Sequence, residues 1–143
     1  MRWSMSGMAP KIIDANWILR YLLRDDETLF AKASGVLEKA KTGEEKILIL
    51  ESVLAECIYV LLKIYRVDRI AVAEKMGDLF SYKGVMNPDR KDLIEAIHLF
   101  SRTNFSIVDC LLLAKSINHG WPLLAFDKDL KNACSKREKS KED

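Results

Sequence analysis

Short apolar runs and longer amphipathic segments follow one another along this chain. The apolar runs, typical of buried strands, cover residues 11–13, 46–50 and 121–126, with a shorter one at 84–87. Between them, apolar residues recur every three or four positions, which is the period of a helix with one buried face. Strands that alternate with helices are typical of a parallel sheet covered on both faces, so the pattern predicts the α/β class.

Seven helices are predicted between and after these strands. Besides one that follows Asn16, they cover residues 28–42, 52–65, 68–82, 88–102, 106–119 and 127–134. Several boundaries are marked by residue types that cap helices, namely Asp26 or Thr28, Asp68, Asn87 and Ser106 at starts, and Gly43 and Gly120 at ends. The helices on either side of Arg66 and Val67 form a predicted hairpin.

Composition indicates one globular domain. The chain has 143 residues, of which 49% are hydrophobic and 31% charged, values expected of a protein with an ordinary core. The net charge of +2 is too small to indicate nucleic acid or membrane binding by itself. We expect a domain over residues 8–134, with flexible termini at 1–7 and at the densely charged 135–143.

Cysteine usage and hydropathy favour a cytoplasmic protein without membrane contact. Cys57, Cys110 and Cys134 form no closely spaced pair, so they are interpreted as reduced thiols. Together with His98 and His119 they have no zinc-ligand spacing. The first ten residues lack the pattern of a secretory signal, and no run is long and apolar enough to span a bilayer.

Four acids stand in apolar surroundings. Asp14 and Asp127 follow predicted strands, while Glu56 and Asp109 lie near the starts of predicted helices. Burying an unpaired carboxylate is costly, and Lys and Arg are sparse beside these positions. In an open parallel sheet, ligands bind at the carboxyl ends of the strands. We therefore expect the four acids to converge there on a hard divalent cation, Mg²⁺ or Mn²⁺, for which oxygen atoms are the preferred ligands.

Four segments resemble the PIN-domain family, most closely the VapC-type toxins of prokaryotic toxin–antitoxin pairs. They are IIDANWILRYLLRDD, ESVLAECIYVLLKIY, FSIVDCLLLAKS and PLLAFDKDL, and together they cover about residues 11–130. The resemblance implies a three-layer α/β/α sandwich with a central parallel sheet. It also implies a Mg²⁺- or Mn²⁺-dependent endoribonuclease that hydrolyses RNA phosphodiester bonds, forms a homodimer and is blocked by a cognate antitoxin.

The resemblance assigns roles to individual residues. The family's catalytic and metal-binding acids fall on Asp14, Glu56, Asp109 and Asp127. Asn16 falls where a polar residue orients the first acid or a bound water. Ser106 is interpreted as a supporting residue, and Asp129 as a supporting or solvent-facing one. The chain departs from the pattern at Ala15, where Thr or Ser is usual, and at Ser106, where many members carry an extra Asp.

Simpler interpretations stand beside these roles. Asp14 and Asp127 are good helix caps, and Asp109 fits a capping box with Ser106. Trp17 is interpreted as a core or dimer-contact residue rather than a base-stacking platform.

Two other classes of protein are alternatives to a nuclease. A receiver domain needs an adjacent acidic pair after its first strand, which KIIDAN lacks. The alternative to an enzyme is a PIN-fold module that binds RNA or protein with little or no catalysis.

Overall fold

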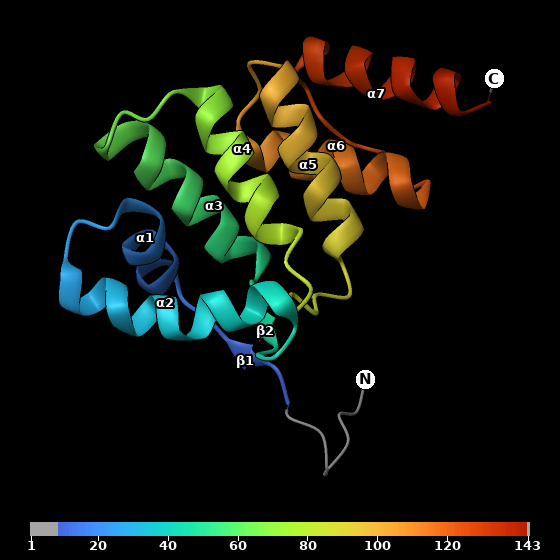
Figure 1. Ribbon diagram of the computed structural model, residues 1–143. Helices are drawn as coiled ribbons and strands as arrows, with labels where there is room; N and C mark the ends of the chain where they lie inside the picture. The colour runs from blue at the N-terminus through green and yellow to red at the C-terminus, as the bar shows by residue number, and fades with distance from the viewer. Residues whose placement is uncertain (1–8, 143) are drawn as a thin grey trace. The chain divides into compact units, whose positions relative to one another are not determined.

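The described part of the chain is mainly helical and contains a small parallel sheet (Figure 1). The computed structural model describes the backbone of residues 9–142 and the side chains of residues 9–136. The chain divides into two compact units, the first ending at Arg90 and the second beginning at Lys91. No helix in the described range is both long and apolar enough to cross a membrane.

The sheet of the first unit consists of β1 (Lys11–Ile12) and β2 (Ile47–Leu48), which pair in parallel with Lys11 opposite Ile47. On its other edge, β2 forms a parallel bridge between Ile47 and Val85. The carbonyls of Lys46 and Leu48 accept hydrogen bonds from the N–H groups of Lys11 in β1 and of Ile13 just after it. The N–H and carbonyl of Ile47 bond toward the Val85 segment. β2 therefore lies in the middle of three parallel segments.

The predicted third strand, 84–87, is thus reduced to one bridge. Beyond this bridge, the side chain of Asn87 takes the place of a strand and pairs with the backbone just after β2. The Asn87 amide accepts a hydrogen bond from the Ile49 N–H at 2.9 Å and donates one to the Ile49 carbonyl at 2.6 Å. Asn87 is 8% exposed, so these bonds satisfy backbone groups that water does not reach. The expectation that the Asn87 side chain caps the next helix is wrong, because it is engaged by Ile49.

Two helices follow β1 directly. α1 (Ala15–Leu23) begins at Asp14, and α2 (Glu27–Thr42) begins at Asp26 and ends at Gly43, whose φ of 91° is the left-handed value that favours glycine. α1 and α2 pack against each other, and α1 also contacts α3 (Figure 1). Their buried faces include the fully or nearly fully buried Ile18, Leu19, Ala33 and Leu37.

The predicted hairpin is present, but its first helix changes geometry. α3 (Glu51–Tyr59) passes into a π-helical turn, η1 (Val60–Ile64), before α4 (Arg69–Phe80), which is capped by Asp68. The Tyr65 N–H bonds to the Val60 carbonyl, one residue further back than in an α-helix. The wider turn alters which side chains after residue 60 face the core.

The second unit contains three helices. α5 (Arg90–Arg102), whose first residue ends the first unit, α6 (Ile107–His119) and α7 (Lys128–Glu142) make up its described structure. The Ser116 hydroxyl of α6 lies 3.4 Å from the Cys134 thiol of α7. Ser106 caps α6 and Gly120 ends it, as predicted. α7 continues to Glu142, past the end expected for this helix at residue 134.

The prediction of a strand over 121–126 is wrong for the described structure. These residues belong to no strand, and Leu124 and Phe126 are 96% and 102% exposed. A strand requires a neighbour that supplies hydrogen-bond partners along its length. In the described part of the chain, the hydrogen bonds of this segment are confined to Trp121, which pairs with Ser116.

Candidate functional site

Asp14 lies where β1 ends and α1 begins. Its Oδ1 accepts a hydrogen bond of 3.1 Å from the Trp17 N–H, which makes it the cap of α1. The side chain is exposed, so the second oxygen remains available to a ligand. The position therefore serves both interpretations of the sequence, because a capping carboxylate uses one oxygen and a metal ligand needs the other.

Glu56 is the second acid of the first unit. It is exposed on α3, while the adjacent Cys57 is fully buried with its thiol pointing toward the Ala15 carbonyl. Burial, together with the negative charges of Glu56 and Asp14, raises the pKa of Cys57 to about 12. Both carboxylates therefore lie close enough to this thiol to act on it electrostatically.

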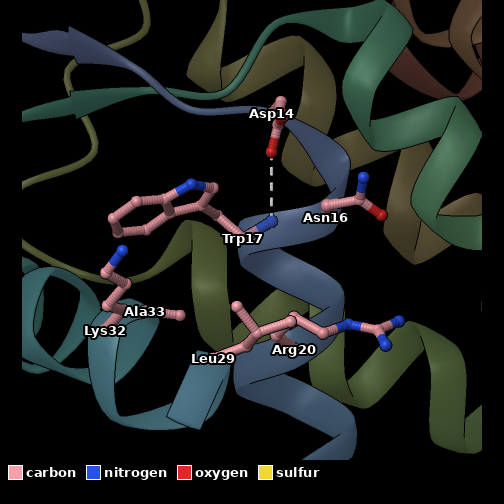
Figure 2. A pocket seen from close by; sticks show the side chains of 7 residues that line it. All are labelled: Asp14, Asn16, Trp17, Arg20, Leu29, Lys32 and Ala33. Atoms are coloured by element: carbon pink, nitrogen blue, oxygen red, sulfur yellow. Dashed lines mark hydrogen bonds between the residues drawn. The ribbon is translucent and has the colours of Figure 1, made fainter. Parts of the chain in front are cut away.

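An open cavity of about 480 Å³ adjoins Asp14 between α1 and α2 (Figure 2). Asp14, Asn16 and Trp17 line it where α1 begins, and Arg20 lines it one turn further along. α2 contributes the side chains of Leu29, Lys32 and Ala33. In the view of Figure 2, the Trp17 ring and Lys32 lie toward one side of α1, and Asn16 and Arg20 toward the other.

Arg20 is held in place by two partners. Its guanidinium bonds to Asp25 at 2.9 Å and to the Tyr65 hydroxyl at 3.4 Å, and Tyr65 also donates to Asp25 at 3.3 Å. The hydrogen bond with Tyr65 and the charge of Asp25 outweigh burial and raise the pKa of Arg20. The π-helical turn before Tyr65 therefore helps to position a permanent cation beside the cavity.

Asp109 lies in the first turn of α6, in the second unit. Its N–H donates to the Ser106 hydroxyl at 3.1 Å, so Ser106 fills the capping role predicted for it. The reciprocal bond of a capping box, from the Ser106 N–H to the Asp109 carboxylate, is absent from the described structure. The carboxylate is partly exposed and available to a ligand.

Asp127 precedes α7 in the same unit. Its Oδ1 accepts a hydrogen bond of 3.0 Å from the Leu130 N–H, the same arrangement that Asp14 has at α1. Asp129 lies in the first turn of α7 and is exposed. Like Asp14, Asp127 keeps one carboxylate oxygen free of its capping bond.

The donor atoms of these acids suit a hard cation. Asp14 and Glu56 offer carboxylate oxygens, and the neighbouring Cys57 stays a neutral thiol, which is a poor ligand. Among the described residues, no three His, Cys, Asp or Glu side chains gather closely enough to hold a metal ion. The four predicted acids are divided two and two between the units, so their convergence stays a prediction.

Sequence reasoning missed the cavity itself. Trp17 is 39% exposed, which corrects the interpretation of this residue as part of the core. The signal was present in the spacing: Asn16 and Arg20 are one helical turn apart, and Lys32 and Ala33 follow Leu29 at the same period on α2. What the sequence did not contain was the angle at which the two helices meet.

Comparisons with known proteins identify one family. The PIN domain matches residues 11–136 of the chain. Curated proteins and solved structures gave no significant match. PIN domains are nuclease-type modules that generally depend on divalent metal ions and often occur in toxin–antitoxin systems. The match covers most of the 143 residues, and it includes all four predicted acids, so the chain belongs to the PIN-domain family.

Proposed function

We propose that this protein is a metal-dependent endoribonuclease and the VapC-type toxin of a toxin–antitoxin pair, acting in the cytoplasm. The observation that carries the proposal is the PIN match over residues 11–136. It is supported by the position of Asp14 at the carboxyl end of a parallel strand, with Glu56 near the same buried thiol. Ligands bind at this end of parallel strands in open sheets.

In this proposal, Asp14, Asp109 and Asp127 hold Mg²⁺ or Mn²⁺, and Glu56 holds it directly or through a water, or orients the nucleophile. A bound divalent cation neutralises phosphate charge and lowers the pKa of a coordinated water. The protein's contribution is positional. The capping bonds from the Trp17 and Leu130 N–H groups fix the carboxylates of Asp14 and Asp127 before any ligand arrives.

The remaining residues support these acids. Asn16 is exposed next to Asp14 in the cavity, where its amide orients Asp14 or a water molecule. Ser106 holds the first turn of α6 and so positions Asp109. Asp129 contributes negative charge near Asp127. The three-layer sandwich, the homodimer and the antitoxin that covers the site are further parts of the proposal and follow from the toxin assignment.

A cleavage assay with Mn²⁺ tests the enzyme. Asp14→Asn removes a charged metal ligand but keeps a good helix cap, because Asn and Asp are about equally favoured there. We expect this variant to lose at least about 100-fold in RNA cleavage, as expected when a group that stabilises transition-state charge is removed. Asp68→Asn is the matched control, because Asp68 caps α4 through the Ile70 N–H and belongs to no predicted site.

Two outcomes would contradict the proposal. Clean wild-type protein that binds RNA but shows no Mn²⁺-dependent cleavage would favour the non-catalytic binding module. Cleavage that survives both chelation of metal and the Asp14→Asn substitution would point to a contaminating nuclease or to a different mechanism. Equal losses of RNA cleavage in Asp14→Asn and Asp68→Asn would indicate that the substitutions damage folding rather than a catalytic site.

A further inference from the structure

The cavity between α1 and α2 has features that the proposed chemistry at Asp14 does not use. Metal binding needs carboxylates, yet most of the lining consists of an indole ring, aliphatic side chains and two cations (Figure 2). Its volume of about 480 Å³ lies within the range of pockets that bind small organic ligands.

Trp17 gives the cavity an exposed aromatic wall. The residue follows Asp14 by three positions, and its own N–H is the donor to that carboxylate. The wall is therefore tied to the predicted metal ligand by a hydrogen bond within one helical turn. Leu29 and Ala33 of α2 supply further apolar surface to the same cavity, so an unpaired base stacked on Trp17 has apolar neighbours there.

Lys32 gives the cavity an available positive charge. It makes no ion pair with the residues that the structure describes, and its side chain is exposed. The other cation, Arg20, is already engaged by Asp25 and Tyr65. Lys32 is therefore the side chain that can reach an incoming anion, whereas Arg20 acts as a fixed charge.

We propose that this cavity binds one nucleotide of single-stranded RNA next to the cleaved phosphate, with its base stacked on Trp17 and a phosphate contacted by Lys32. The inference rests on the proposed function, because Asp14 at the rim must belong to the cleavage site. It adds to that function the two side chains that hold the substrate beside the cleavage site. A base inside a duplex is already stacked on its neighbours, so the Trp17 wall selects unpaired RNA.

RNA binding by Trp17 variants tests the stacking. Every protein carries Asp14→Asn so that the probe, a short single-stranded RNA of mixed sequence, is not cut during the measurement. We expect Trp17→Leu to weaken binding about tenfold and Trp17→Phe, which keeps an aromatic face, to weaken it about threefold or less. A duplex of the same sequence should bind weakly and equally to both variants.

Lys32 is tested by the salt dependence of the same binding. Each phosphate contact to a single strand adds about 0.7 to the slope of log affinity against log salt concentration. We expect Lys32→Ala to reduce the slope by about that amount. Lys39→Ala is the matched control: it removes the same charge from α2 outside the cavity, and its slope should stay at the wild-type value.

Tryptophan fluorescence of a protein that keeps Trp17 tests the stacking even if the Trp17 variants fail to fold. In a chain with Trp3→Phe and Trp121→Phe, Trp17 is the remaining tryptophan, since the sequence contains three. Stacking of a base should quench its fluorescence as single-stranded RNA is added. An unchanged signal at RNA concentrations that saturate binding would overturn the proposal.

Failure of this inference is distinguishable from failure of the proposed function. If wild-type protein cleaves RNA with Mn²⁺ but Trp17→Leu and Trp17→Phe both bind the probe as tightly as the protein that keeps Trp17, the nucleotide subsite is wrong. The proposed enzyme activity then still stands. If Lys32→Ala and Lys39→Ala change the salt slope equally, the phosphate contact is wrong. Absence of Mn²⁺-dependent cleavage in wild-type protein would overturn the nuclease instead.

Discussion

Asp92 is a buried carboxylate whose partners are contributed by another helix of the second unit. It is 6% exposed and accepts hydrogen bonds of 2.8 Å from both Asn118 and His119 at the end of α6. The His119 ring also stacks on Trp121, with 4.3 Å between centroids. Because a buried charge is tolerated only when it is paired, these contacts bind the first turn of α5 to the end of α6.

This arrangement predicts how stability responds to acid. Burial alone would raise the pKa of Asp92, but the bonds from Asn118 and His119, with the charges of His119 and Lys115, hold it below its ordinary value. A lowered carboxyl pKa adds stability that is present above the unfolded-state pKa, near 4, and is lost as pH falls through the folded value. Urea unfolding at falling pH should show this loss.

The comparison variant for this titration is Asp92→Asn. It should be less stable at neutral pH and should lose less stability on acidification, because its side chain does not titrate. Asp78→Asn, at an exposed position of α4, should follow the wild-type curve. A pH dependence that is the same in wild type and Asp92→Asn would contradict the assignment.

Close packing between α2 and the sheet depends on a glycine. The Gly84 N–H bonds to the Ala40 carbonyl at the end of α2, and the Gly84 carbonyl accepts from Ile47 of β2, both at 2.8 Å. A Cβ at this position would collide with the Glu45 carbonyl oxygen and lie 2.8 Å from that of Ala40. Both obstacles are backbone atoms, which cannot rotate away as a side chain does.

Two alanine substitutions in the first unit should therefore have opposite effects on the free energy of unfolding. Gly84→Ala should destabilise the protein by about 2–3 kcal/mol, as overpacking does. Gly35→Ala should stabilise it by about 0.5–1 kcal/mol, since a Cβ there meets nothing within 4 Å and glycine disfavours a helix interior. Chemical denaturation of both variants beside wild type checks the pair; destabilisation of similar size in both would refute the packing argument.

The molecule as a whole carries little net charge, +2 over 143 residues. Long-range attraction of RNA is therefore weak, and binding as proposed would depend on local groups such as Lys32 and on the proposed cation. If the four acids converge as predicted, their carboxylates repel one another, and a bound metal ion would relieve this repulsion. Metal binding should consequently be visible in the stability of the folded protein, apart from any activity.

Thermal unfolding with and without Mn²⁺ measures this coupling. A ligand that binds the native state alone stabilises it by about 2.7 kcal/mol at 100 times its dissociation constant. We expect Mn²⁺ to raise the Tm of wild-type protein and chelation to reverse the change. Asp14→Asn should respond much less, and Asp68→Asn should respond like wild type. An equal rise in Asp14→Asn and wild type would argue against Asp14 as a ligand.

The sequence by itself determined the local features of this protein. Asp26, Asp68 and Ser106 cap the helices predicted for them, and Gly43 and Gly120 end theirs in the left-handed conformation. These outcomes depend on atoms within a few residues, such as a side-chain oxygen and the N–H three positions later. The four motifs, in their order and spacing, likewise predicted the PIN family, which the match over residues 11–136 confirms, because they are read directly from the chain.

Only the tertiary structure decided features in which distant residues meet. The Asn87 side chain was predicted to cap a helix, but it pairs with the backbone of Ile49 instead. Residues 121–126 have the composition of a strand but do not form one in the described structure. Trp17 was interpreted as a core or dimer-contact residue, and the packing of α1 on α2 leaves it outside the core, on the wall of a cavity. Periodicity reports which side of an element is apolar, but the neighbour that covers that side is set by packing between segments far apart in sequence.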